Sequence, residues 1–128
     1  MKVYNSLSRK LEEFKPLNDN QVTIYVCGIT PYDTAHLGHG FTYISFDALI
    51  RYLKFLGYSV IYTQNVTDIN DRDKDILEQA KKQNIAWSKL ANFWTKKFLA
   101  DMQSLNWIPP TYYPKASEQI VSIIRIID

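Results

Sequence analysis

Hydrophobic residues along the chain form short segments whose spacing predicts both strands and helices. Residues 22–27 (VTIYVC) are mainly β-branched or aromatic and precede Gly28, which is typical of a buried strand. Residues 59–66 (SVIYTQNV) form a second segment of this kind. Between them, steps of three and four predict an amphipathic helix from about 37 to 56, with Gly57 as its C-terminal cap. Its predicted apolar stripe consists of Phe41, Ile44, Ala48, Tyr52 and Phe55.

This order of strand, helix and strand predicts a βαβ unit over about 22–66, with parallel strands and a right-handed crossover. After a polar stretch at 70–75, helical patterns follow at 76–83 and 87–105, where Pro109 and Pro110 are expected to stop the second helix. A last helix is expected from near Ser117. Its apolar side carries Ile120, Ile123, Ile124 and Ile127.

Two parallel strands are too few for a stable sheet, because parallel sheets are normally buried on both faces by further βα units. We therefore interpret residues 1–128 as the first half of a larger nucleotide-binding domain, with a helical region over about 71–128 and no second domain. The last helix and the edge of the second strand should then be exposed, which predicts self-association of the isolated chain.

Composition narrows the class of protein. The chain has 128 residues, 46% hydrophobic and 22% charged, which excludes disorder and collagen-like structure. A net charge of +2 is too small for a domain that binds nucleic acid tightly by itself. One cysteine cannot form an internal disulfide, and neither a signal peptide nor an apolar run of about 20 residues is present. We expect a cytoplasmic protein without a membrane span.

The chemistry is concentrated between the first strand and the first helix, at the edge where open α/β sheets bind ligands. The helix start favours phosphate, and His36 and His39 can each donate a hydrogen bond to it. Gly38, without a Cβ, would let adenine or ribose pack against the backbone. This predicts an ATP site. The same His-x-x-His spacing also suits a surface pair at a helix start or a partial metal site, and Cys27 would by default be a small buried hydrophobe.

Several motifs taken together are more specific than the histidine pair. They are YVCGITPYD at 25–33, HLGH at 36–39, FD at 46–47, RYLKFLGY at 51–58 and QNVTDI at 64–69. With these motifs the chain resembles the N-terminal catalytic region of cysteinyl-tRNA synthetases over nearly its whole length. In that resemblance, residues 36–39 are the class I synthetase HIGH signature with Leu37 in place of Ile.

The resemblance implies an α/β fold, the first half of a class I synthetase Rossmann-like (HUP-type) nucleotide-binding domain. It implies that His36, Gly38 and His39 bind ATP, which enters with magnesium as a substrate, and that His36 and His39 are also catalytic. It further implies that Gly28, Thr30 and Thr67 bind cysteine or its adenylate, and that Cys27 is a zinc ligand. The implied function is activation of cysteine with ATP and charging of tRNA-Cys.

The sequence departs from the family pattern at Asn70, which replaces a carboxylate in the acidic run after Asp68. The family's other zinc ligands, second ATP-binding loop and anticodon-binding region are expected beyond residue 128, so the chain alone should be inactive or very weak. Two alternatives stay open. One is a cysteine ligase of the mycothiol type, which uses a small amine as acceptor. The other is a free-standing, non-catalytic nucleotide-binding module.

Overall fold

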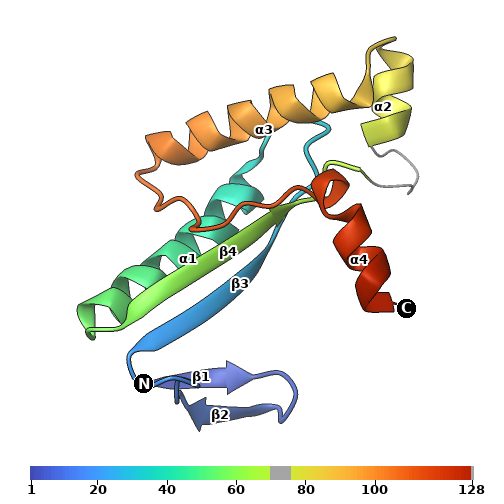
Figure 1. Cartoon of the computed structure of the whole chain (residues 1–128). Helices are drawn as coiled ribbons and strands as arrows, with labels where there is room; N and C mark the ends of the chain where they lie inside the picture. Colours follow the sequence, from blue (N-terminus) through green and yellow to red (C-terminus); the bar gives the residue numbers. More distant parts are fainter. Residues whose placement is uncertain (70–75, 128) are drawn as a thin grey trace.

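Two parallel strands form the centre of the structure (Figure 1). The computed structural model describes residues 1–69 and 76–127. Strand β3 (Gln21–Ile29) and strand β4 (Ser59–Val66) are joined by helix α1 (Leu37–Phe55). The α/β class, the parallel βαβ unit and the bounds of the second strand are therefore confirmed. The first strand is longer than predicted, because it continues through Gly28.

Helix α1 ends as its sequence predicts, within one residue. Gly57 follows the C-cap residue Leu56 and has a φ of +92°, which glycine adopts without strain. The Gly57 N–H donates to the Lys54 carbonyl at 3.0 Å, and the Tyr58 N–H donates to the Leu53 carbonyl at 3.1 Å. These two bonds form a Schellman motif and satisfy carbonyls that the helix end leaves unpaired.

One face of the strand pair carries the core. Helix α1 and helix α3 (Trp87–Ser104) both pack on this face, and the aromatic rings of Tyr43 and Phe98 meet edge to face with centroids 5.3 Å apart. Helix α2 (Ile76–Lys82) packs against α3 in a second, smaller cluster. Residues on the other face of β3 are exposed, namely Thr23, Tyr25 and Cys27. The site at the end of β3 is thus supported from one side only.

The buried side of α1 differs from the predicted one. Phe41, Ala48, Tyr52 and Phe55 of the predicted stripe are exposed, and only Ile44 packs against the core. The helix instead buries Tyr43, Asp47, Ile50 and Leu53. Because this buried row includes the carboxylate of Asp47, it does not show the purely apolar spacing by which a buried helix face is recognised in a sequence. The burial of this carboxylate is compensated, because Asp47 accepts hydrogen bonds from the Ile108 N–H (2.8 Å) and from Nε of Arg51 (2.6 Å).

The chain after α3 returns along the outer edge of β4. The prolines do not end α3. The helix stops at Ser104, and Asn106 adopts a left-handed conformation with a φ of 56°. The N–H groups of Gln64 and Val66 then donate to the carbonyls of Tyr112 and Pro114, at 3.1 and 2.9 Å. The predicted exposure of the β4 edge is therefore wrong over this stretch. Within the described residues, the edge of β3 that faces away from β4 pairs with no other strand.

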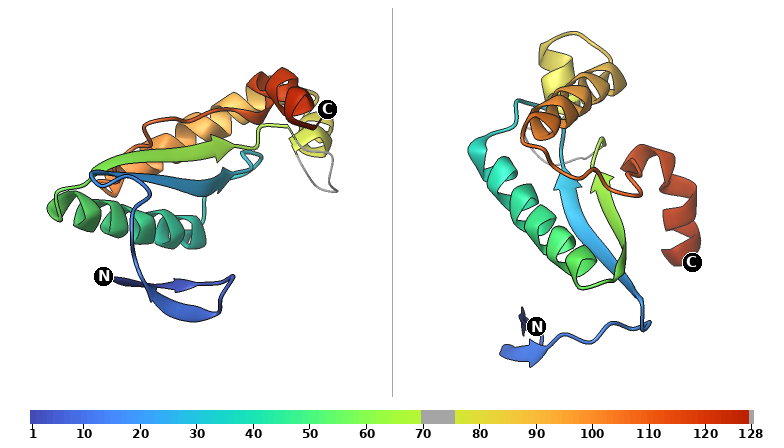
Figure 2. Two further views of the ribbon diagram at one scale, coloured as in Figure 1. Left: turned by 60° about the horizontal axis from the view of Figure 1, so that its bottom comes forward. Right: turned by 90° about the vertical axis from the view of Figure 1, so that its left-hand side faces the viewer.

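Both ends of the chain depart from the sequence-based picture (Figure 2). An unpredicted hairpin of β1 (Lys2–Asn5) and β2 (Lys10–Glu13) lies apart from the helices, near the start of β3. Its strands are short and largely exposed, so they carry little hydrophobic signal. At the other end, Ala116–Glu118 is a 3₁₀ turn. Helix α4 therefore begins at Ile120, not at Ser117, and runs to Ile127.

Every described residue of α4 is exposed, as predicted for its apolar side. Within residues 1–69 and 76–127, no helix combines the length and the apolar character needed to cross a bilayer. The polar stretch expected at 70–75, including Asn70, lies outside the described residues.

Candidate active site

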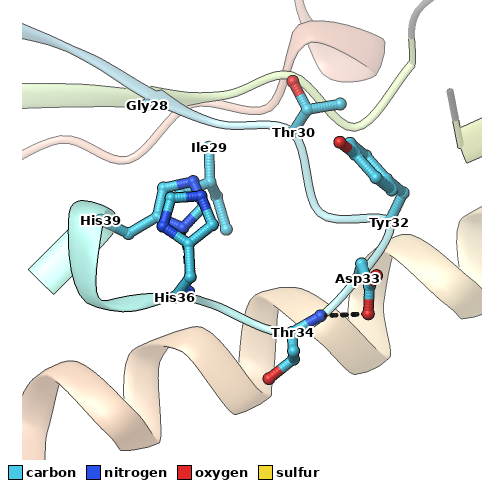
Figure 3. A pocket seen from close by; sticks show the side chains of 8 residues that line it. All are labelled: Gly28, Ile29, Thr30, Tyr32, Asp33, Thr34, His36 and His39. Atoms are coloured by element: carbon cyan, nitrogen blue, oxygen red, sulfur yellow. Dashed lines mark hydrogen bonds between the residues drawn. The ribbon is translucent and has the colours of Figure 1, made fainter. Parts of the chain in front are cut away.

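A pocket of about 320 Å³ lies where β3 ends and the chain turns into α1 (Figure 3). This volume is at the lower end of the range for small-molecule sites, about 300–1,000 Å³. Its position is the predicted one, at the carboxyl end of a parallel strand and the start of the following helix. The lining consists of Gly28, Ile29, Thr30, Tyr32, Asp33, Thr34, His36 and His39.

The two histidines form a reciprocal cap on α1. His36 is the N-cap residue, and its Nδ1 accepts a hydrogen bond from the Gly38 N–H at 3.1 Å. In return, Nδ1 of His39 accepts from the His36 N–H at 3.3 Å. This is a capping box in which imidazoles replace the usual hydroxyl and carboxylate. The two rings lie against each other in Figure 3. Their centroids are 4.0 Å apart and their planes make an angle of 25°.

The cap decides which ring nitrogens are free to bind a ligand. A neutral imidazole has one N–H donor and one acceptor nitrogen. Because Nδ1 of each ring accepts a backbone hydrogen bond, the proton of each neutral ring lies on Nε2. The site therefore offers two Nε2–H donors beside the N-terminus of a helix, which is also favourable for negative charge. This arrangement suits phosphate oxygens.

Burial lowers the pKa of His39 below its ordinary value of 6.5, and the neighbouring His36 lowers it further. A protonated His39 would lose its acceptor nitrogen and hence its half of the cap. The lowered pKa and the cap therefore favour the same neutral form. His39 is set up as a neutral donor at physiological pH, not as a permanent cation.

Gly38 has a structural role that its sequence position did not predict. A Cβ at this residue would lie 2.9 Å from Nδ1 and Cε1 of His36, so glycine leaves room for the ring that caps the helix. Gly38 does not line the histidine pocket. It borders an apolar hollow on the other side of the helix start, together with Leu37 and Phe41. Packing of adenine or ribose against Gly38 stays a prediction.

The predicted cysteine-binding residues lie in or directly after two strands. Gly28 and Thr30 line the pocket, whereas Thr67 directly follows β4 and does not border it. The backbone still brings them together, because the Thr67 N–H donates to the Ile29 carbonyl at 2.9 Å. A Cβ at Gly28 would lie 1.5 Å from the carbonyl oxygen of Asn65. Only glycine allows the strands to approach this closely.

Cys27 is exposed near the end of β3, so its default interpretation as a buried hydrophobe is wrong. Across residues 1–69 and 76–127, no group of three or more histidine, cysteine, aspartate or glutamate side chains is placed to hold a metal ion. The described residues therefore do not form a zinc site by themselves. They supply a single accessible thiol.

Three residues at this end of the strands were not singled out from the sequence. Tyr32 and Asp33 line the pocket. The Asp33 carboxylate accepts a hydrogen bond from the Thr34 N–H at 2.6 Å, so one of its oxygens is engaged by the loop backbone. Asn65 bonds across the strand pair to Gly28. The sequence signal was a pair of polar amides, Gln64 and Asn65, within an otherwise strand-like segment.

Comparison with known proteins agrees with this geometry. The family model described as the catalytic domain of class I (C) tRNA synthetases matches residues 13–128. The chain belongs to this synthetase family. A protein named cysteine--tRNA ligase from Dehalococcoides mccartyi is 48% identical over 127 residues, which is 99% of this chain and 27% of the relative. Relatives of the same name from Methanococcus maripaludis and Pyrococcus horikoshii are 47% and 45% identical over the whole chain, which covers 26% of each.

Membership in the class I (C) synthetase family confirms the resemblance seen in the sequence, and the parallel strand pair followed by helices fits the N-terminal part of such a domain. The chain spans about a quarter of the length of the curated relatives it matches. In this chain, the HLGH segment forms the helix cap described above.

Proposed function

We propose that this chain carries the ATP- and cysteine-binding part of a cysteine--tRNA ligase. The observation that supports this most directly is the stacked pair His36 and His39, whose Nδ1 atoms are both engaged by the helix backbone. Their Nε2–H groups are left as donors at a pocket between the first strand and first helix of a class I (C) synthetase fold. A merely structural cap needs a side-chain acceptor at the N-cap, not two imidazoles.

The proposed reaction is adenylation of cysteine. A carboxylate oxygen of cysteine attacks the α-phosphorus of ATP, the bond to the bridging oxygen breaks, and pyrophosphate leaves. His36 and His39 donate hydrogen bonds to phosphate oxygens on which negative charge grows, and the N-terminus of α1 adds a favourable dipole. No strong acid or base is required, because positioning and charge stabilisation lower the barrier. ATP enters with magnesium as a substrate.

The proposed amino-acid side of the site comprises Gly28, Thr30 and Thr67. Gly28 and Thr30 lie in the same pocket as the histidines, so a bound amino acid there would be close to a bound nucleotide. Thr67 reaches this region from the end of β4, beside Ile29. Contributions from both strands are expected at the carboxyl edge of a parallel sheet.

The role of Cys27 is proposed in a limited form. Its thiol is accessible, and a thiolate is a strong ligand for zinc, whereas a serine hydroxyl is a poor one. Because the described residues do not complete a metal site, any further ligands would have to come from outside them. We therefore propose Cys27 as one zinc ligand and assign no reaction step to the metal.

The first test is cysteine-dependent exchange of pyrophosphate into ATP by the full-length protein. The proposal expects exchange with cysteine and little with serine. Exchange that does not depend on cysteine, or its absence in a folded protein that binds ATP, would contradict it. The latter result would favour the non-catalytic binding module. Intact mass of the native gene product would then show whether a free-standing chain of 15.0 kDa exists.

The acceptor of the activated cysteine is a separate proposal. The names of the curated relatives favour tRNA, so the adenylate formed in the exchange assay should be discharged by a tRNA-Cys transcript. Discharge by a small amino-glycoside and not by tRNA would instead support the mycothiol-type ligase. A cytoplasmic location stays a prediction.

Self-association of the isolated chain also stays a prediction. It now rests on the exposed residues of α4 and the open edge of β3. Sedimentation of the isolated chain at micromolar concentration tests it, and a compact monomer would contradict it.

A further inference from the structure

Asn65, in β4, joins the two strands through its side chain. Its Oδ1 accepts hydrogen bonds from the Gly28 N–H at 2.7 Å and from the Tyr25 hydroxyl at 3.0 Å. Its Nδ2 donates to Oγ1 of Thr67 at 3.2 Å. One carboxamide thus contacts both strands beside the pocket, including two residues predicted to bind cysteine.

These bonds lie at an irregularity in the sheet. The strands pair in regular register up to Val26 and Gln64, and pairing resumes at Ile29 and Val66. Two residues of β3 therefore lie opposite the single residue Asn65, which is a β-bulge. Bulges interrupt the ladder of backbone hydrogen bonds and are frequent next to active sites, where they redirect side chains.

The Asn65 side chain replaces a hydrogen bond that the bulge removes from the ladder. The Gly28 N–H is part-buried and donates to the carboxamide oxygen. Without that acceptor, a polar group inside the strand pair would lose its partner, which is costly in a buried setting. The close approach of the Gly28 backbone to the Asn65 carbonyl leaves no room for the bulge to relax inward.

The other end of the carboxamide orients Thr67. Because Oγ1 of Thr67 accepts from Asn65, the hydroxyl proton of Thr67 is not used in that bond and can be donated elsewhere. The Thr67 N–H is meanwhile engaged with the Ile29 carbonyl. The side-chain and backbone bonds together fix where Thr67 sits relative to the pocket-lining end of β3.

We propose that Asn65 is a positioning residue for the amino-acid side of the site. It holds the bulge at Cys27 and Gly28 and keeps the Thr67 hydroxyl free to donate to the substrate. This inference rests on the proposed function, because it assumes that cysteine binds at Gly28, Thr30 and Thr67. It extends that function by naming a residue that touches neither substrate but sets the geometry of those that do.

The proposed role needs both the oxygen acceptor and the nitrogen donor of the amide, so two variants of Asn65 should behave differently. In Asn65→Ala the hydrogen bonds at both ends of the carboxamide are lost, those from Gly28 and Tyr25 and the one to Thr67. In Asn65→Asp a carboxylate still accepts from the Gly28 N–H but cannot donate to Thr67, whose hydroxyl proton would then be drawn to the carboxylate. Thr63→Ala is the matched control, because Thr63 lies two residues earlier in β4, on the same face and outside this network.

The experiment uses the full-length protein and two readouts. The first is amide hydrogen exchange of the peptide that contains residues 27–29. The second is pyrophosphate exchange with cysteine and ATP varied separately. We expect Asn65→Ala to accelerate amide exchange in this peptide and to raise the KM for cysteine by about tenfold, with the KM for ATP changed less than about threefold. Asn65→Asp should restore amide protection but not the cysteine KM, and Thr63→Ala should resemble wild type in both.

Three outcomes would overturn the inference. They are a wild-type cysteine KM in Asn65→Ala, equal increases in the KM values for cysteine and ATP, and full recovery of the cysteine KM in Asn65→Asp. Failure of the proposed function has a different signature. The wild-type protein would then show no cysteine-dependent exchange, while amide protection at residues 27–29 would still depend on Asn65 if the bulge is held as described.

Discussion

Substitutions at His36 can separate helix capping from the proposed catalytic role, because the two roles use different nitrogens of one ring. Nδ1 accepts the Gly38 N–H and caps α1, whereas Nε2–H is left for a ligand. Asparagine is among the best N-cap residues, and its side-chain oxygen can accept the same backbone bond. His36→Asn should therefore keep the cap and remove the proposed phosphate donor. His36→Ala removes both.

The expected magnitudes differ accordingly. Loss of an N-cap side chain costs about 0.5–2 kcal/mol of stability. Loss of one preorganised donor to developing charge costs about 10²–10³ in kcat, or about 2.7–4 kcal/mol of transition-state stabilisation. His36→Ala should thus be less stable than His36→Asn, while both should lose activity to a similar extent. The shared loss should appear mainly in kcat, because the bond strengthens as charge develops.

The assay is cysteine-dependent pyrophosphate exchange by the full-length protein, paired with denaturant unfolding of each variant. Leu37→Ile is a suitable control, because it restores the family's HIGH sequence without touching either imidazole. The reasoning would be refuted if His36→Asn retained wild-type kcat. It would also be refuted if the activity of the two His36 variants followed their stability.

Four further predictions follow from individual contacts. Gly28→Ala should destabilise the protein by about 3 kcal/mol or more, because its Cβ would lie 1.5 Å from a backbone oxygen; urea unfolding measures this. Asp47→Ala should cost about 2 kcal/mol in the same assay, since the part-buried Ile108 N–H loses its acceptor. Because the pKa of His39 is lowered in the folded chain, His39 binds a proton more readily in the unfolded chain than in the folded one. Stability should therefore be fully retained above pH 6.5 and fall on acidification below it, less steeply in His39→Gln. Cys27→Ser should lower the zinc content of the full-length protein without unfolding it, and unchanged metal content would contradict the proposed ligand.

Local patterns were sufficient for the βαβ unit and for the position of the histidines. The segment that became β4 is bounded by turn residues and is rich in β-branched and aromatic residues, so its bounds needed no tertiary information. The end of α1 at Gly57 was equally local, because a positive φ selects glycine. The HLGH segment stood out because it lies between a predicted strand and a predicted helix, at the edge where open α/β sheets bind ligands.

Features that depend on distant partners could not be predicted. Asp47 points into the core because Ile108, far along the chain, supplies an N–H for it. The apolar stripe at Phe41 and Phe55 looked like the better core face, yet α3 packs against the other side. The end of α3 was assigned to prolines, although the left-handed conformation of Asn106 ends the helix earlier.

The sequence by itself determined the fold class, the family and the position of the histidine pair that we propose binds phosphate, because these depend on residue type and short spacing. Only the tertiary structure decided how those residues are used. Backbone hydrogen bonds to Nδ1 of His36 and His39 fix which nitrogen of each ring is free, and the bulge opposite Asn65 brings Gly28 and Thr67 together from segments that are far apart in sequence. Hydrogen bonds between distant segments have no periodicity along the chain, so no local pattern could reveal them.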